Sequence, residues 1–357
     1  MGNLFDCLAW RGDLTFDRSP FGPVDGLILS TLSYVHFDAL VSESLQEAPV
    51  PLGKAAEGYL SLPAARRGRC RCEDDLKLLR ALATSPRFAR LGRGCRTDRF
   101  VPKEETQFAA LAFLLGDGSA FLAFRGTDGT LTGWKEDFNL SFQDVVPAQL
   151  EAAGYVQGFA EGFPGPLRLG GHSKGGNLAV AGAALSAMKI RDRIRSVWSF
   201  DGPGATPYLL SRPGYQELLT RIHSFVPRSS VVGLLLAHEE PYTVVESNQE
   251  GLFQHNPYSW QVLGPDFVRL EEVDAGSRLI DRTLKNWLAG LTNAQRETVV
   301  DTLYELLSNR NATTVKDALE PKNLAGALRS ALDANPKDLL TVASSLARLA
   351  GAALRAL

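Results

Sequence analysis

The sequence holds few of the residues that mark metal sites and disulfide frameworks. Among its 357 residues there are 4 cysteines, 2 methionines and 5 histidines. Scarce cysteines, and no signal-peptide pattern near Met1, predict reduced thiols in a cytoplasmic protein. Cys70 and Cys72 lack a second pair at zinc-site spacing, so we expect no structural metal. No motif implies an organic cofactor either.

Two further absences concern nucleic acids and membranes. The formal net charge is −2, so the whole chain has no electrostatic attraction to nucleic acid, and we expect no such partner. The local cluster of Arg66, Arg67, Arg69 and Arg71 is interpreted as a solvated loop. No apolar run reaches the ~18 residues that span a bilayer. Peripheral membrane contact through the last predicted helix, Pro336 to Leu357, remains an alternative.

The composition that is present is that of a globular protein, with 45% hydrophobic and 22% charged residues. Strand and helix patterns alternate through the middle of the chain. They comprise a hairpin at Thr106–Leu115 and Ala120–Phe124, a helix at Gln149–Phe163, strands at Ile194–Phe200 and Arg221–Val226, and a helix at Tyr215–Thr220 between them. This alternation predicts an α/β fold with a mainly parallel central sheet.

The pattern changes after about Val273, where strand signals end. Helical patterns follow at Ser277–Leu291, Asn293–Leu307, Leu324–Leu332 and Pro336–Leu357. We therefore predict a domain at residues 1–272, which includes an N-terminal helical segment, and an all-helical region at residues 273–357.

The most informative stretch is Leu167–Ala179, which reads L-R-L-G-G-H-S-K-G-G-N-L-A. It places Ser173 between Gly171 and Gly175, after a short apolar run and before a helical pattern rich in Ala and Gly. This is the strand–turn–helix context of a nucleophile elbow, in which the sharp turn leaves no room for a β-carbon on either side of the serine. His172 is expected to point away from the nucleophile, into the packing around the elbow.

Acyl transfer by serine needs a base, an acid that orients the base, and donors for the oxyanion. Among the histidines after the elbow, His223 has a strand pattern typical of a buried side chain, and His238 is typical of an exposed helix end. His255 follows the last strand-like run in a loop, so we favour it as the base. Asp201 ends the strand after the elbow helix, where it either reaches His255 or forms an Asp-Gly turn. The other candidate acids are Glu239, Glu240 and Glu246.

The oxyanion donors are expected on two segments. The backbone N–H of Lys174 follows the nucleophile into the helix N-terminus. A second donor usually comes from a loop after an early strand, and Gly126-Thr127 fits that place.

These motifs together resemble the class 3 lipase branch of the α/β-hydrolase fold, over about residues 107–255. The matching stretches are Phe124-Arg125-Gly126-Thr127 with Trp134-x-x-Asp137, Gly171-His172-Ser173-x-Gly175-Gly176, and Phe200-Asp201-Gly202-Pro203. The whole chain is similar to an uncharacterised bacterial family within that superfamily. The resemblance implies an α/β-hydrolase fold, with an all-helical C-terminal extension in this chain. It also implies Ser173 as nucleophile, His255 as base, and Thr127 and Lys174 as oxyanion donors.

The sequence departs from the lipase pattern in two places. Lys174 replaces a leucine and puts a cation beside the nucleophile. Ser229-Ser230-Val231-Val232 stands where an Asp-x-Val is expected, so Ser230 occupies the usual acid position. Either Asp201 supplies the acid or the enzyme is impaired.

The sequence therefore predicts a serine hydrolase that acts on a carboxylester or lipid acyl ester through a Ser173 acyl-enzyme. The alternative is a catalytically impaired α/β-hydrolase-fold module that binds an acyl or lipid ligand or a protein partner. No oligomeric state is predicted.

Overall fold

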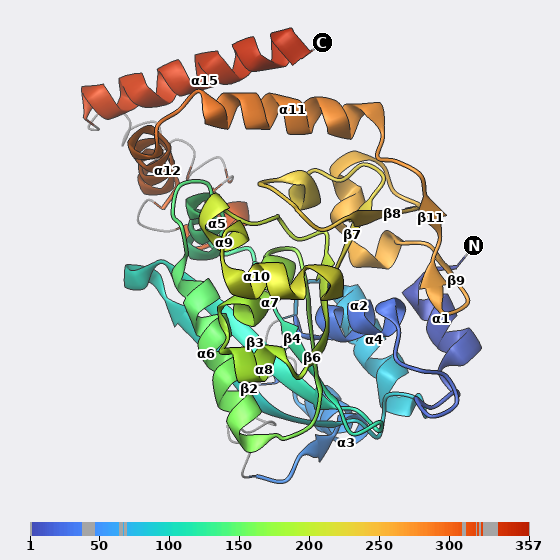
Figure 1. Cartoon of the computed structure of the whole chain (residues 1–357). Helices are drawn as coiled ribbons and strands as arrows, with labels where there is room; N and C mark the ends of the chain where they lie inside the picture. Colours follow the sequence, from blue (N-terminus) through green and yellow to red (C-terminus); the bar gives the residue numbers. More distant parts are fainter. Residues whose placement is uncertain are drawn as a thin grey trace.

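Nine strands form the central sheet of the computed structural model, in the order β1-β2-β3-β4-β5-β6-β7-β8-β11 (Figure 1). The structure describes residues 2–37, 47–63, 67, 70–308, 312–318, 320, 323 and 335–356. The strands are β1 (Val50–Pro51), β2 (Gly92–Val101), β3 (Thr106–Leu114), β4 (Ala120–Phe124), β5 (Leu167–His172), β6 (Ile194–Phe200), β7 (Ile222–Pro227), β8 (Tyr242–Val245) and β11 (Arg269–Leu270). A separate pair joins β9 (Val262–Leu263) to β10 (Asp266–Phe267).

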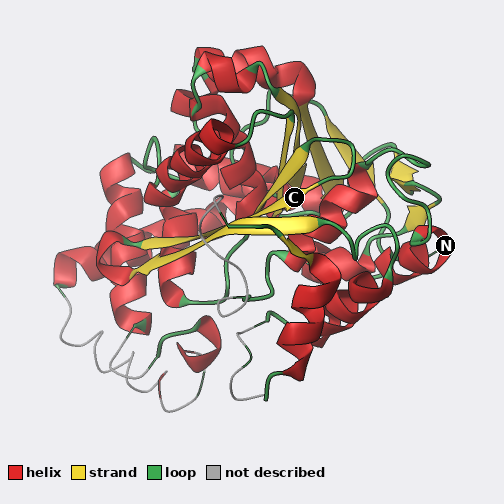
Figure 2. Cartoon of the chain, turned by 90° about the horizontal axis from the view of Figure 1, so that it is seen from below, coloured by secondary structure: helices red, strands yellow, loops and turns green. Residues whose placement is uncertain are grey.

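The strands from β4 to β8 run parallel, whereas β1 to β4, and β11 beside β8, are antiparallel. The helices are α1 (Leu4–Arg11), α2 (Pro23–Leu32), α3 (Leu52–Ser61), α4 (Glu73–Thr84), α5 (Leu131–Asn139), α6 (Pro147–Gly162), α7 (Lys174–Leu185), α8 (Met188–Arg191), α9 (Pro207–Leu210), α10 (Pro213–Leu218), α11 (Ala275–Ala289), α12 (Asn293–Leu307), α13 (Val315–Ala318) and α15 (Pro336–Ala356). They cover both faces of the sheet, as Figure 2 shows.

The topology explains which helices cover which face. Successive parallel strands step across the sheet in one direction, so right-handed crossovers place their helices on the same side. Helices α6, α7 and α10 accordingly share one buried cluster with Leu122 and Phe124 of β4. This is the α/β-hydrolase fold, with a largely parallel sheet and the turn after β5 near its centre.

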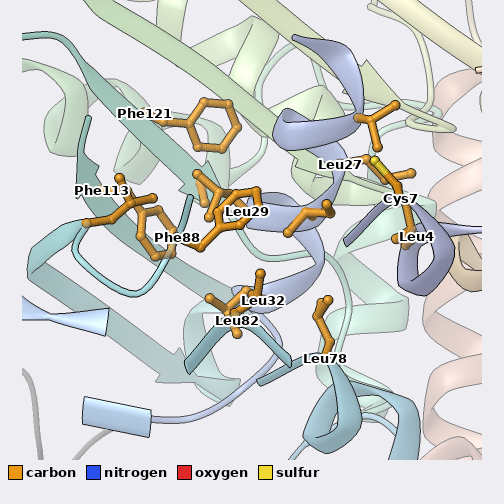
Figure 3. Packing of buried hydrophobic residues seen from close by; sticks show 14 of the residues in the cluster. Leu4, Cys7, Leu27, Leu29, Leu32, Leu78, Leu82, Phe88, Phe113 and Phe121 are labelled. Atoms are coloured by element: carbon orange, nitrogen blue, oxygen red, sulfur yellow. The ribbon is translucent and has the colours of Figure 1, made fainter. Parts of the chain in front are cut away.

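The opposite face is covered by the N-terminal helices α1, α2 and α4. Phe121 of β4 points to this side, because neighbouring strand residues alternate between faces. Figure 3 shows leucines of α2 between the sheet phenylalanines and the leucines of α4. Gly26 lets α2 lie close to the sheet, since a β-carbon there would come 2.1 Å from the Trp198 ring. Each buried Leu or Phe side chain stabilises this layer by about 1.5–3 kcal/mol.

After β11, the regular elements among the described residues are helices. Helices α11 and α15 lie side by side at the top of Figure 1, and α12 packs against α15. Trp287 of α11 donates its ring N–H to the backbone oxygen of Ser345 in α15, at 2.9 Å. The helix predicted at 324–332 lies outside the described residues, and the division of the chain at residue 272 stays a prediction. None of the described helices combines the length and the apolar character that crossing a membrane requires.

The predicted hairpin, the helix before the elbow and the two predicted strands after it are confirmed. The sequence did not predict β2, because its residues G-R-G-C-R-T-D-R-F-V lack a clean alternation of apolar and polar positions. Arg93 of this strand is fully buried and stacks over the Phe37 ring at 3.7 Å, so a charged residue occupies a core position.

Candidate active site

The turn between β5 and α7 holds Ser173 in a backbone conformation that serine rarely adopts, with φ 59° and ψ −137°. A β-carbon at Gly171 would lie 2.2 Å from the Gly175 backbone, and one at Gly175 would lie 2.2 Å from the Phe124 carbonyl oxygen. Only glycine fits at either position. The predicted strand–turn–helix context is confirmed, and the Ser173 side chain lines a pocket.

His255 and Asp201 meet beside this turn. His255 is the last residue of a short 3-10 helix after β8 (Gly251–His255), and its Nδ1 donates to Oδ2 of Asp201 at 2.6 Å. Asp201 follows the end of β6 and is 1% exposed. Because Nδ1 carries the proton, Nε2 of a neutral His255 is left with its lone pair. His255 and Ser173 line the same pocket.

Ser230 occupies the position where the lipase pattern has its acid, and it contacts Asp201 directly. Its Oγ donates to Oδ1 of Asp201 at 2.5 Å, and the Gly233 backbone N–H donates to the same oxygen at 3.1 Å. The loop after β7 therefore holds a carboxylate that comes from the neighbouring strand β6. Ser230 thus stands at the position of the usual acid and donates a hydrogen bond to Asp201, the carboxylate that takes its place.

A second histidine–carboxylate pair supports this loop. Nε2 of His238 donates to the Gly233 carbonyl oxygen at 2.8 Å, and Nδ1 donates to Glu240 at 2.8 Å. Both ring nitrogens of His238 thus face oxygen atoms of this network. Burial alone would raise the pKa of Glu240, but hydrogen bonds from His238, Ser224 and the tyrosine hydroxyl of α10 lower this pKa to about 2.

Two predictions for the histidines were therefore wrong. His238 is partly buried in a polar network and is not an exposed helix end, because Glu240 draws it inward. His223 is exposed, although its strand pattern indicated a buried side chain; it is the one exposed residue of β7 (Ile222–Pro227).

His172 points away from the nucleophile, as predicted, and fixes the His255 loop. Its Nε2 lies 2.7 Å from the His255 carbonyl oxygen and therefore donates, and its Nδ1 accepts from the Tyr34 hydroxyl at 3.1 Å. Burial lowers the pKa of His172 well below its usual value, so the ring is neutral. The residue before the serine thus holds the backbone of the candidate base.

The loop after β4 lies against the elbow. A β-carbon at Gly126 would be 3.2 Å from the β-carbon of Ser173. Thr127 donates its hydroxyl to Oδ2 of Asp137 in α5 at 2.6 Å, so the Thr127 and Trp134-x-x-Asp137 motifs meet in space. The backbone N–H groups of Thr127 and Lys174 donate to no described residue of the chain. Both residues line the pocket that holds Ser173.

Burial raises the pKa of Asp137, the residue that accepts the Thr127 hydroxyl. Removal from bulk water raises the pKa of Asp137 to about 6, although Lys174 and the Thr127 hydroxyl favour its charged form.

Lys174, the predicted cation beside the nucleophile, is held in a buried ion pair. Its Nζ lies 2.9 Å from Oε2 of Glu136 and donates to both the backbone and side-chain oxygens of Gln107, at 2.9 and 3.0 Å. Lys174 is 1% exposed, and Glu136 is fully buried. The ion pair instead connects the start of α7 to α5 and β3.

The pocket beside Ser173 is a cavity of about 1000 Å³. Much of its wall comes from the C-terminal helices, through Leu284, Trp287, Leu288, Leu291, Val299 and Val300. A concave, largely apolar lining of this kind is typical of small-molecule binding sites. Among the described residues, no group of histidines, cysteines and carboxylates is arranged to hold a metal ion.

A model of one protein family matches residues 82–305, which is more than half of the chain and includes Ser173, Asp201 and His255. The chain belongs to the Mbeg1-like family. This is a lipase-like family of the α/β-hydrolase fold, and its name states no reaction.

Solved lipase structures also resemble the Mbeg1-like protein. The native lipase–propeptide complex of Rhizomucor miehei is 16% identical over 45% of this chain, with a TM-score of 0.33. The chain spans 58% of that lipase. A fungal lipase–inhibitor complex is 14% identical over 56% of this chain and 78% of its own, with a TM-score of 0.35. A mutant of MDLA from Penicillium cyclopium is 13% identical over 71% and 87%, with a TM-score of 0.39. No curated protein matches the chain.

Sequence reasoning missed several residues that build the site of the Mbeg1-like protein. Tyr34 reaches His172 from a segment 138 positions earlier, and Glu136 neutralises Lys174 from 38 positions earlier. No local pattern signals such pairs. Arg71, which was expected in a solvated loop, lines the cavity, whereas Arg67 bonds main-chain oxygens nearby; Arg66 and Arg69 lie outside the described residues.

Proposed function

We propose that this Mbeg1-like protein is a serine hydrolase that cleaves a carboxylic or lipid acyl ester through an acyl-enzyme on Ser173. The 2.6 Å hydrogen bond between His255 and Asp201, beside a serine at a nucleophile elbow, carries the proposal. It supplies the orienting acid whose absence from the usual position motivated the alternative of an impaired binding module.

The first half of the reaction forms the acyl-enzyme. His255 Nε2 takes the proton of the Ser173 hydroxyl while Oγ attacks the ester carbonyl carbon. Asp201 stabilises the imidazolium that forms and holds its tautomer. The backbone N–H groups of Thr127 and Lys174 donate to the oxyanion, and removal of one such donor costs about 10²–10³ in turnover. His255 then protonates the leaving alcohol, and the C–O bond breaks.

The second half returns the enzyme to its starting state. Water enters the place of the alcohol, His255 takes one of its protons, and the resulting hydroxide attacks the acyl carbon. The tetrahedral intermediate collapses to the free acid, and Ser173 regains its proton from His255. No metal or organic cofactor takes part in this scheme.

The apolar wall of the cavity supports an acyl group of considerable length. A cavity of about 1000 Å³ exceeds what an acetyl group would fill. Each buried methylene contributes about 0.8 kcal/mol, so longer acyl chains gain affinity until the wall is covered.

The test is hydrolysis of p-nitrophenyl octanoate by the full chain. Ser173→Ala abolishes activity above background, whereas Ser186→Ala, at the other end of α7, retains it and serves as the matched control. Equal activity in the wild type and Ser173→Ala would sink the proposal.

We further propose a cytoplasmic location, which the four free thiols support. Mass spectrometry of thiols alkylated in intact cells tests this, since disulfide-bonded cysteines would contradict it. Peripheral membrane contact through α15 stays a prediction.

A further inference from the structure

The cavity beside Ser173 has two chemically different sides. Helices α11 and α12 line one side with leucine, valine and tryptophan side chains. The other side is lined by Tyr34, His36, Cys70 and Arg71, which come from the ends of the N-terminal segments. A ligand that fills this space is therefore amphiphilic, with its apolar part against the C-terminal helices.

Arg71 is held in place on the polar side. Its guanidinium carbon lies 4.6 Å from the centre of the Tyr34 ring and 5.8 Å from that of Tyr258. Fully buried Asp75 accepts the Arg71 backbone N–H at 2.8 Å and contacts Nη2 at 3.4 Å. The two tyrosine rings hold the plane of the guanidinium, and the hydrogen bond to Asp75 anchors the Arg71 main chain, so the group is oriented before a ligand binds.

The guanidinium keeps donors to spare. Nε and Nη1 of Arg71 donate to no described residue, and the Asp75 oxygens also accept from the Tyr258 hydroxyl at 2.9 Å and the Cys72 backbone at 3.1 Å. The other cations that line the cavity are engaged, since Lys174 pairs with Glu136 and Arg296 donates to two main-chain oxygens.

The described carboxylates around this side already have other partners. Asp98 accepts two hydrogen bonds from Arg125, at 2.9 and 3.0 Å. Of the two aspartates that line the cavity, Asp137 accepts the Thr127 hydroxyl at 2.6 Å and Asp128 accepts the Thr130 backbone N–H at 3.1 Å.

Arg71 also lies close to the site of the proposed chemistry. Arg71 stacks on the Tyr34 ring. The Tyr34 hydroxyl and the β-carbon of Ser173 both lie next to Gly126, since a β-carbon built at Gly126 would be 2.2 Å from the first and 3.2 Å from the second. Because Arg71 and Ser173 line one cavity, a single small molecule can place an anionic group at Arg71 and an ester at Ser173.

We propose that Arg71 binds an anionic group, a phosphate or a carboxylate, on an amphiphilic substrate whose apolar chain lies against α11 and α12. Planar guanidinium binds both anions through paired, charge-assisted hydrogen bonds. This proposal adds a substrate class to the proposed function, namely an acyl ester that carries a negative charge. The ester bond rests on the proposed function, whereas the anion site at Arg71 does not.

The test measures binding rather than turnover, so that it does not depend on the nucleophile. Calorimetric titrations of the Ser173→Ala chain use three ligands of equal chain length: octyl phosphate, octanoate and octanol. Each is repeated with Arg71→Gln added. Arg67→Gln is the matched control, because it removes the same charge from the same segment but Arg67 bonds the Leu60 and Leu62 carbonyls.

We expect at least one anion to bind about tenfold or more tightly than octanol, since a charge-assisted hydrogen bond contributes roughly 1.5–3 kcal/mol. Arg71→Gln removes this difference, and Arg67→Gln does not. The tighter of the two anions identifies the phosphate or the carboxylate source.

Three results would overturn the assignment: octanol binding as tightly as both anions, a preference for anions that survives Arg71→Gln, or no binding by any of the three. Failure of the proposed function looks different. In that case octyl phosphate or octanoate still binds through Arg71, while Ser173 forms no acyl-enzyme and the esters stay intact.

Discussion

Asp201 is the residue that orients the base His255 in the proposed reaction. It lies beyond the end of β6 with φ 50°, a left-handed conformation that aspartate tolerates better than most residues. Ser230 and Gly233 donate to one oxygen, and His255 donates to the other. The carboxylate is thus oriented from both sides, which favours one imidazole tautomer.

Asp201→Asn tests this arrangement without changing the shape of the side chain. The amide stabilises the wrong tautomer and lacks the charge that stabilises the imidazolium, so kcat for p-nitrophenyl octanoate falls by about 10⁴. Asp192→Asn, an exposed aspartate next to α8, is the control and keeps its rate. Undiminished turnover in Asp201→Asn would show that the acid lies elsewhere.

Asp137 makes a prediction about stability and pH. Burial raises its native pKa to about 6, above the ordinary 3.8, so between about pH 4 and about pH 6 the native state holds a proton that the unfolded chain has lost. This contribution to the free energy of unfolding is present at low pH and is lost as the pH rises through about 6.

Asp137→Asn has no such ionisation. We therefore expect the variant to gain stability relative to the wild type as the pH rises from about 4 to about 6, in urea unfolding followed by circular dichroism. A difference between the two proteins that stays constant across this range would contradict the assignment.

At the scale of elements, the buried pair of Lys174 and Glu136 joins the elbow helix to α5. Glu136 also accepts the backbone N–H groups of Gln107 and Ala148, at 3.1 and 2.9 Å. The pair therefore fixes α7, α5 and β3 relative to one another, and these elements carry Ser173 and Asp137.

Removing one partner leaves a buried charge. Lys174→Met is expected to lower the free energy of unfolding by about 3–5 kcal/mol, because the Glu136 carboxylate loses its cation. Adding Glu136→Gln removes that charge, and the double variant recovers part of the loss. Chemical denaturation of Lys174→Met, Glu136→Gln and the double variant measures this coupling. A double variant that loses the sum of the two single effects would show that the pair is not coupled.

The sequence predicted those elements whose signals are local. The elbow follows from Gly171 and Gly175, and the hairpin follows from two apolar runs around a Gly-rich turn. Strand β2 was missed because arginines occupy both exposed and buried positions in it. Asp201 was a candidate from its place after a strand, but its contact with Ser230 depends on how two neighbouring loops pack.

At the scale of the whole molecule, the C-terminal helices add a wall to the cavity beside Ser173. Helices α11 and α12 supply the apolar wall, and α15 covers α11 from outside (Figure 1). Lys135 of α5 bonds Asp301 of α12 at 2.9 Å and lies 4.7 Å from the Tyr304 ring centre, which holds α12 over the loop after β4.

Truncating this wall should change the preference for acyl length. Trp287→Ala removes a large apolar surface, so we expect the ratio of kcat/KM for the octanoyl over the acetyl p-nitrophenyl ester to fall about tenfold. Comparing two substrates on one preparation separates this effect from lost protein. Trp10→Ala, on α1 and 51% exposed, is the control. An unchanged ratio in Trp287→Ala would place the acyl chain away from α11.

Activation of Ser173 as a nucleophile is tested most directly by intact and peptide mass spectrometry of the full chain after reaction with a fluorophosphonate. We predict one adduct per chain, located on Ser173, and no adduct on Ser173→Ala. A wild-type chain that stays unlabelled, or a Ser173→Ala chain that is labelled to the same extent, would contradict it.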